Sequence, residues 1–162
     1  MPRLYWRLRV LRVTLPADVR LVLEAALRRA RHKECGGVLM GEHVGPNHFV
    51  VRHLTVHRPG AVASFVRRLA GVVGAIRRYC QAHGNEYQRF NYLGEWHSHP
   101  LFSAQPSAKD HASMRELVTD RSVGANFVVL MVVRLNSNEL EGSVHTYLPD
   151  GSVHPSHLDL EG

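Results

Sequence analysis

The chain has 162 residues, of which 44% are apolar and 21% are charged. This length fits a single domain that buries about two-thirds of its unfolded surface, so a disulfide framework is not needed. Ordinary apolar content and charge of both signs exclude a disordered chain. The longest apolar runs, such as 127–133, are too short to cross a bilayer, and the arginine-rich start lacks the apolar core of a signal peptide. We therefore expect a cytoplasmic protein with no membrane partner.

The net charge is +6, and all but two of the 20 basic residues (Lys33 and Lys109) are arginine. Nucleic-acid binding is one interpretation of this excess. The basic residues are spread along the chain without a nucleic-acid motif, which favours a solvated surface biased towards arginine instead. Cys35 and Cys80 form no C-x-x-C pair, so we expect reduced thiols and no bridge.

Apolar periodicity and turn residues predict alternating strands and helices. In chain order these are a strand over Leu4–Val13, a helix over Ala17–Ala30, strands over Cys35–Gly41 and Phe49–Val56, a helix from Ser64 to about His83, a strand over Tyr92–Trp96, a helix from Ser107 to about Val118, and strands over Phe127–Leu135 and Ser143–Leu148. The tail from Asp150 is expected to be irregular. The pattern predicts one α/β domain over 1–162, with a mixed β-sheet flanked by helices.

Three features of the sequence bring metal-ligating and acid–base groups together. His97 and His99 are two apart on an extended segment, so both imidazoles face the same side. Asp110 follows Ser107 by three residues, which places both in the first turn of one helix. Glu34 lies at the mouth of a glycine-rich strand. Two imidazoles and one carboxylate are a typical ligand set for zinc.

The open fourth position of such a site distinguishes a catalytic zinc from a structural one. Cys35 neighbours Glu34, but its side chain should point to the opposite face of the strand, so we expect an open site with one zinc per chain. Zinc lowers the pKa of a bound water from about 15.7 to about 7. Glu34 is the candidate to take that water's proton and pass it to a leaving amine. Ser107 is the candidate to stabilise the oxyanion.

Each of these residues also has a structural interpretation. Glu34 fits a surface carboxylate at a helix end, Ser107 a helix cap, and Asp110 a first-turn charge favoured by the helix dipole. The other ten histidines are assigned to surface or core. Residues near the motif are read as structural or solvent-facing: Glu95, Ser98, Ser103 and Lys109, with Trp96 in the core. Gly36 and Gly37 are hypothesised to let an extended substrate tail approach the strand.

The segments Glu34–Gly41 (ECGGVLMG), Gly94–Pro100 (GEWHSHP) and Pro106–Asp110 (PSAKD) together resemble the JAMM motif of the JAB/MPN zinc metalloproteases. The resemblance covers roughly residues 13–148. It implies a curved sheet with cytidine-deaminase-like layering and a zinc held by His97, His99 and Asp110. It also implies that Glu34 acts as general acid/base and Ser107 as oxyanion donor. Members hydrolyse peptide or isopeptide bonds after the C-terminal glycine of ubiquitin or ubiquitin-like proteins.

The long second helix and the Tyr92–Pro100 segment are similar to a prokaryotic branch whose genes often accompany E1-like and E2-like proteins, including antiphage systems. The resemblance thus implies a ubiquitin-like or E2-conjugated substrate. Trimming of sulfur-carrier proteins is the alternative within the same chemistry. A non-catalytic scaffold and a basic nucleic-acid module are alternatives outside it. All five expected residues are present, which argues against the scaffold. A zinc deaminase is excluded because the chain has no His-x-Glu followed by Pro-Cys-x-x-Cys.

Overall fold

The computed structural model describes residues 10–57 and 65–162, with side chains described in the second range from residue 73 onward. Within these ranges, strands and helices follow one another in the order β1 (Arg12–Leu15), α1 (Ala17–Ala30), β2 (Gly36–Gly45), β3 (His48–Leu54), α2 (Phe65–Ala82), β4 (Phe90–Ser98), α3 (Ala108–Thr119), β5 (Val128–Asn136), β6 (Glu139–Tyr147) and β7 (Val153–Leu160). The expected α/β fold class, a mixed sheet with helices around it, is confirmed.

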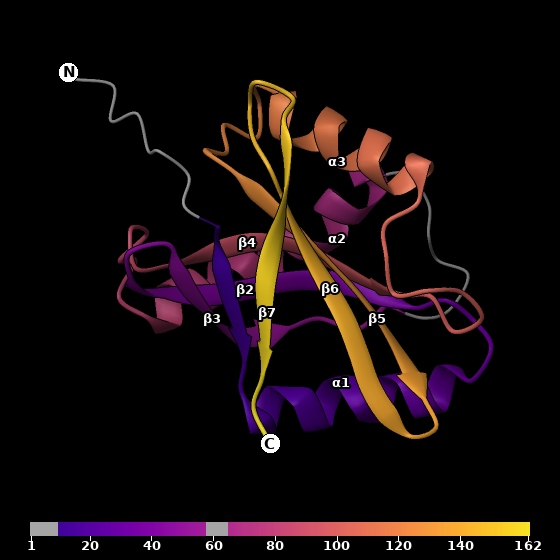
Figure 1. Ribbon diagram of the computed structural model, residues 1–162. Coiled ribbons are helices and arrows are strands. Elements are labelled where there is room, and N and C mark those ends of the chain that lie inside the picture. Colours follow the sequence, from indigo (N-terminus) through magenta and orange to yellow (C-terminus); the bar gives the residue numbers. More distant parts are fainter. Residues whose placement is uncertain (1–9, 58–64) are drawn as a thin grey trace.

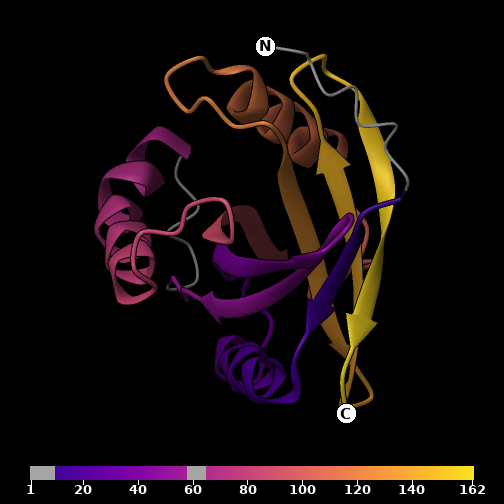
Figure 2. The ribbon, with the colours of Figure 1, turned by 90° about the vertical axis from the view of Figure 1, so that its left-hand side faces the viewer.

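The sheet closes on itself in the strand order β1-β3-β2-β4-β5-β6-β7. Strand β1 closes it by pairing in parallel with both β3 and β7, and β4 pairs in parallel with β5. The other neighbours are antiparallel. In both ribbon views α1 and α3 lie on opposite sides of the sheet (Figure 1, Figure 2).

Both faces of the central strands are buried. On one face α1 packs against β1, β3, β4 and β5 in the largest apolar cluster, which includes Trp96. On the other face α3 packs on β5 and β6, and α2 packs on β2 and β4. Strand β5 contributes alternate residues to both faces, which is why Val128–Val133 reads as an unbroken apolar run.

The connection that positions the chemistry is β4–α3–β5. Because β4 and β5 are parallel, the chain must return through a crossover, and α3 supplies it. The crossover places the first turn of α3 beyond the carboxyl end of β4. In α/β proteins this edge of parallel strands is where ligand sites are built.

The predicted elements agree with the structure except at the two ends. The helix over Ala17–Ala30 is confirmed with the same bounds, and the other helices and inner strands are confirmed with ends shifted by a few residues. The first strand is observed at Arg12–Leu15, while the part of the prediction up to residue 9 and the Ser64 cap lie outside the described residues.

The prediction of an irregular tail from Asp150 was wrong, because Val153–Leu160 forms β7 between β6 and β1. Pro155 obscured this strand, since proline cannot donate a ladder hydrogen bond. It is tolerated because it lies opposite His145 of β6, while the pairing with β1 begins only at His157. Of the helices that the structure describes, none is both long and apolar enough to span a membrane.

Candidate metal centre

Three side chains converge beyond the carboxyl end of β4. His97 Nε2 lies 3.1 Å from His99 Nε2 and 3.3 Å from Asp110 Oδ1. His99 Nε2 lies 3.4 Å from Asp110 Oδ2. Among the described residues this is the one group of three or more metal-ligating side chains whose ligand atoms all lie within 4.8 Å of one another.

The two histidines meet because the chain stays extended across them. His97 lies on β4 and pairs with Gly36 of β2 on one side and with Val132 of β5 on the other. The backbone N–H of His99 donates to Val133 O at 2.9 Å, which continues the alignment one residue past the strand. Alternation therefore directs both imidazoles to the face covered by α3.

Asp110 reaches the histidines from the first turn of α3, where it also completes a capping box. Ser107 N–H donates to Asp110 Oδ2 at 2.7 Å, and Asp110 N–H donates to Ser107 Oγ at 3.2 Å. Burial alone would raise the pKa of Asp110, but hydrogen bonds from His97 and Ser107 and the charge of His97 lower it overall. The carboxylate is therefore ionised at neutral pH, as a metal ligand must be.

The structural role of Ser107 as a helix cap is confirmed. Its Oγ accepts the hydrogen bond from Asp110 N–H, so the hydroxyl hydrogen stays available as a donor.

The orientation of His99 is fixed by the loop that follows it. His99 Nδ1 lies 3.1 Å from Ser103 O, and because a carbonyl only accepts, Nδ1 carries the proton and donates. The Nε2 lone pair is then free to bind a cation. The loop is held in turn: Phe102 N–H donates to His99 O at 3.3 Å, and Arg134 Nη1 donates to Phe102 O at 3.1 Å.

These distances fit a zinc ion. With zinc–ligand bonds of about 2.0–2.1 Å in a tetrahedron, neighbouring ligand atoms lie about 3.3–3.4 Å apart. The separations of 3.1 Å between the two Nε2 atoms and 3.3 Å between His97 Nε2 and Asp110 Oδ1 are close to this edge length, while His99 Nε2 lies 3.4 Å from the other carboxylate oxygen, Oδ2. His99 is 8% exposed, so the group lies largely out of solvent yet at the edge of the sheet.

Cys35 lies on the opposite face from the histidines, as the sequence predicted. It is 2% exposed and belongs to the α1-side core, with Sγ 3.6 Å from Ser98 Oγ. Burial raises the pKa of the Cys35 thiol, which keeps it protonated and a poor metal ligand. Cys35 is not part of the metal-ligating group.

Glu34 is exposed and immediately precedes the segment that pairs with β4. Cys35 O accepts from Ser98 N–H at 2.9 Å, and Cys35 N–H donates to Ser98 Oγ at 3.0 Å. Since Gly36 pairs with His97, alternation puts Glu34, two residues earlier, on the histidine side. Its catalytic role stays a prediction.

Two features of the structure, a hydrogen bond of Tyr147 and the burial of Glu95, were not predicted from the sequence. Tyr147 is fully buried, and its hydroxyl shares a 2.9 Å hydrogen bond with Nδ1 of His111, the residue after Asp110. Burial first, and then the charge of Asp110, raise the pKa of Tyr147. Glu95 is 5% exposed rather than solvent-facing. Neither the Tyr147–His111 hydrogen bond nor the burial of Glu95 has a local sequence signal, because each depends on which helices and strands pack together.

The hypothesis that Gly37 admits a substrate tail is wrong. A Cβ on Gly37 would lie 1.8 Å from Thr55 O, so the protein's own chain occupies that space. Thr55 is fixed there by Val38, whose N–H donates to Thr55 Oγ1 at 3.0 Å, and by Trp96 Nε1, which donates to Thr55 O at 2.9 Å. The space beside Gly36 is likewise filled, by Trp96 O and His97 Cβ.

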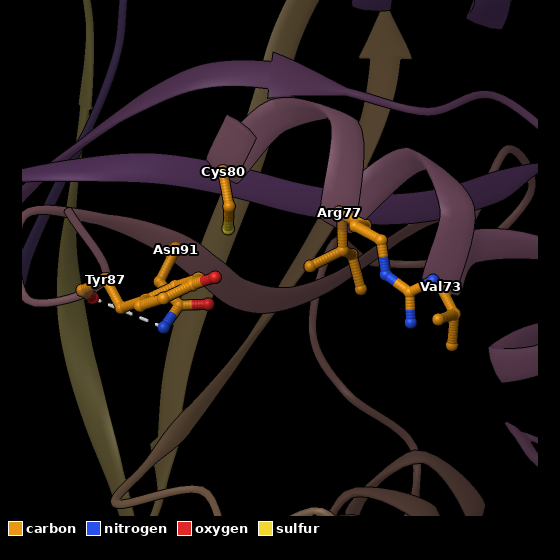
Figure 3. A pocket seen from close by; sticks show the side chains of 6 residues that line it. Val73, Arg77, Cys80, Tyr87 and Asn91 are labelled. Carbon is orange, nitrogen blue, oxygen red and sulfur yellow. Dashed lines mark hydrogen bonds between the residues drawn. The ribbon is translucent and has the colours of Figure 1, made fainter. Parts of the chain in front are cut away.

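A hollow of about 250 Å³ lies away from this centre, between α2 and the turn that leads into β4 (Figure 3). Its lining is Val73, Ile76, Arg77, Cys80, Tyr87 and Asn91. None of the three ligating residues contributes to it, so the hollow and the metal centre are separate features.

Comparison with known proteins agrees with this architecture. Two solution structures share the fold: protein DSY2949 from Desulfitobacterium hafniense (TM-score 0.64, 20% identity, 92% of each chain covered) and a protein from Salinibacter ruber (TM-score 0.53, 19% identity, 91% of each chain covered). No curated protein matches the sequence. A family model described as prokaryotic homologs of the JAB domain matches residues 16–147. The chain therefore belongs to the prokaryotic JAB family.

Proposed function

We propose that this protein is a zinc-dependent peptidase or isopeptidase that hydrolyses the bond after the C-terminal glycine of a ubiquitin-like or E2-conjugated protein. The observation that carries the proposal is the convergence of His97, His99 and Asp110, whose ligand atoms all lie within 4.8 Å of one another. Membership of the JAB family, which contains many metalloproteases, supports the same chemistry.

The three ligands hold the cation in complementary ways. His97 and His99 offer neutral Nε2 atoms, and the Nδ1–H···O=C bond to Ser103 keeps His99 in that tautomer. Asp110 offers a carboxylate whose second oxygen is anchored to Ser107 N–H. When bound, zinc acts as a Lewis acid that makes a nucleophile available near neutral pH.

Proton transfer in this proposal belongs to Glu34. A carboxylate that is exposed and not a metal ligand can accept a proton from the attacking water at Oε and donate it to the amine as the C–N bond breaks. Two observations support this role: Glu34 is exposed, and it lies two residues before Gly36, which pairs with His97.

Stabilisation of the developing oxyanion belongs to Ser107. Its Oγ accepts from Asp110 N–H, so the hydroxyl hydrogen can be directed at the substrate without loss of the cap.

The substrate and partners follow from the family resemblance. A small carrier protein with a flexible tail that ends in glycine, conjugated with the help of E1-like and E2-like proteins in the cytoplasm, fits a centre at the edge of the sheet, because a narrow tail can reach side chains that a folded surface cannot. Trimming of a sulfur-carrier precursor would use the same residues, and a role in antiphage conjugation is part of the same proposal.

The test combines metal content with cleavage. Freshly purified protein is expected to contain one zinc per chain by inductively coupled plasma mass spectrometry. It should cleave a ubiquitin-like protein fused through its terminal glycine to a reporter, or a sulfur-carrier precursor. Comparison of the two substrates separates the alternatives. Glu34→Gln should lose cleavage and keep zinc, and Asp110→Ala should lose both.

The matched control is Glu116→Gln, an exposed glutamate further along α3, which should keep both properties. Removal of zinc with a chelator should lower the thermal unfolding midpoint, because the ion binds the folded chain. Protein that binds no zinc would refute the proposal. Protein that binds zinc and cleaves neither kind of substrate would refute the hydrolase and leave a metal-binding scaffold.

A further inference from the structure

The positive charge of the described residues is neutralised only in part, and one group of unpaired cations lies next to the candidate catalytic glutamate. Six arginines of the described residues lie within 4.0 Å of a carboxylate, in the pairs Arg12–Asp159, Arg20–Glu24, Arg28–Glu24, Arg52–Glu42, Arg89–Glu42 and Arg134–Glu141.

One group of unpaired cations is a basic ridge formed by Arg29, Arg31 and Lys33. All three are exposed, and none has an ion pair among the residues that the structure describes. They occupy the last turn of α1 and the turn that follows it, where no acidic residue intervenes before Glu34. Like charges at this spacing repel one another, while the C-terminal end of the helix dipole attracts cations.

Backbone strain coincides with the ridge. Arg31 has φ 54° and ψ −110° at the C-cap of α1, a conformation that glycine adopts without cost and that other residues rarely adopt. A glycine here would relieve both the strain and part of the repulsion. Strained non-glycine residues cluster at functional sites, so the position of Arg31 next to the candidate catalytic glutamate is consistent with a role in binding.

The ridge adjoins the candidate catalytic groups. Lys33 is followed by Glu34, and Cys35 is bonded through its backbone to Ser98, between the two histidine ligands. A protein whose tail enters the centre would therefore bring the surface next to its tail against the ridge.

We propose that the basic ridge binds an acidic surface on the protein substrate, next to the tail that is cleaved. This inference rests on the proposed function and names the substrate class: carrier proteins that are acidic around the base of their C-terminal tail. Opposite charges at the rim of a contact accelerate encounter and select the partner more than they raise affinity. The effect should therefore be strongly dependent on salt.

A protein surface fits the ridge better than a nucleic acid does. Proteins that bind along a phosphate backbone neutralise about six to ten phosphates. The ridge offers three cations on one helix end. Other cations without a carboxylate partner among the described residues, such as Arg77 and Arg121, lie on α2 and after α3.

The experiment measures binding, with no cleavage. Two fluorescein-labelled peptides share an apolar tail that ends in Gly-Gly, and carry four glutamates or four lysines upstream of it. Fluorescence anisotropy is measured in the zinc-loaded Glu34→Gln background at 50 and 200 mM NaCl. The ridge variant Arg29→Glu/Arg31→Glu/Lys33→Glu is compared with Arg77→Glu/Arg78→Glu/Arg121→Glu, which changes the net charge equally on other elements.

At 50 mM NaCl the acidic peptide should bind at least tenfold more weakly to the ridge variant and no more than about threefold more weakly to the control, and the difference should shrink at 200 mM. The lysine peptide should bind more weakly than the acidic one. Equal weakening in both variants would overturn the proposal, since net charge alone would then explain binding. A single-stranded oligonucleotide that binds more tightly than the acidic peptide, and only through the ridge, would also overturn it.

Single substitutions keep the test valid if the triple variant does not fold. Arg31→Gly should raise the unfolding midpoint and weaken acidic-peptide binding, whereas Arg31→Lys should keep the binding. Unchanged binding in Arg31→Gly would contradict a role for this charge. Zinc content and reporter cleavage, measured separately, distinguish failure of the ridge from failure of the hydrolase: ridge binding can persist in a protein that cleaves nothing, and cleavage can persist without ridge binding.

Discussion

Replacement of Tyr147 by phenylalanine tests whether the first turn of α3 is anchored through its hydrogen bond to β6. The hydroxyl is buried and lies 2.9 Å from Nδ1 of His111. Loss of such a bond costs about 0.5–1.5 kcal/mol, and a buried partner left unsatisfied adds about 1–3 kcal/mol. His111 is half-buried and partly reached by water, so we expect Tyr147→Phe to lower the free energy of unfolding by about 1–2 kcal/mol. For a chain of this length that is about 2–8 °C in the midpoint.

The free energy of the Tyr147–His111 hydrogen bond also limits how far Tyr147→Phe can lower the affinity for zinc. Asp110 precedes His111, so a less constrained turn weakens the third ligand. The substitution cannot remove more free energy than the bond supplied, and 1.4 kcal/mol corresponds to about a tenfold change in affinity. We expect zinc affinity, measured by competition with a chromogenic chelator, to fall about three- to tenfold.

Tyr79→Phe is the matched control. Tyr79 is also buried, at 8% exposed, but it lies on α2 and packs against β2, and its hydroxyl has no hydrogen-bond partner among the described residues. Removal of an unsatisfied hydroxyl should be neutral or stabilising. Zinc affinity should not change. If Tyr147→Phe were as stable as Tyr79→Phe and bound zinc equally well, the anchoring of α3 through Tyr147 would be refuted.

Three further substitutions test the packing and charge interactions. Gly37→Ala should destabilise the protein by about 3 kcal/mol or more, because its Cβ would lie 1.8 Å from Thr55 O, whereas Gly45→Ala, with no atom within 4 Å, should change stability by less than about 0.5 kcal/mol in urea unfolding. Arg31→Gly should stabilise by about 1 kcal/mol, and a destabilisation would remove the argument for strain. Hydrogen bonds from Arg89 lower the pKa of Glu42; burial opposes this shift, and Arg52 adds to it. The contribution of Glu42 to the stability of the fold is therefore present above its unfolded pKa and is lost as the pH falls through its folded pKa. Glu42→Gln should therefore cost about 1–3 kcal/mol at pH 7 and much less near pH 3, and an equal cost at both would contradict the ion-pair explanation.

The metal ligands were predictable because each depends on local geometry. Alternation along an extended segment puts His97 and His99 on one side, and a capping sequence puts Asp110 in the first turn of a helix. What the sequence left open is that these two pieces meet, which follows from the parallel pairing of β4 with β5. The apolar run of β5 indicated burial on both faces, and hence a central strand.

The closure of the sheet was not predictable in the same way. Strand β7 (VHPSHLDL) has polar residues and Pro155 in its first half, and it pairs with a strand 145 positions earlier, His157 opposite Arg12. Its place is fixed by β6 on one edge and β1 on the other rather than by its own pattern. The anchoring of Tyr147 to His111 was missed for the same reason, because the two residues lie on β6 and α3.

The relation between Glu34 and the histidines depends on the register of β2 against β4, and Gly94 determines that register. Leu39 pairs with Gly94 and Met40 with Tyr92, so Leu93 is an extra residue in β4. Gly94 has φ 151°, and a Cβ there would lie 1.9 Å from Val129 O. Only glycine permits this approach of β4 to β5 while the extra residue is accommodated. A shift of one residue would turn Glu34 to the opposite face from His97. The Gly94-Glu95-Trp96-His97 sequence therefore specifies a register as well as a candidate ligand, and the proposed role of Glu34 depends on that register.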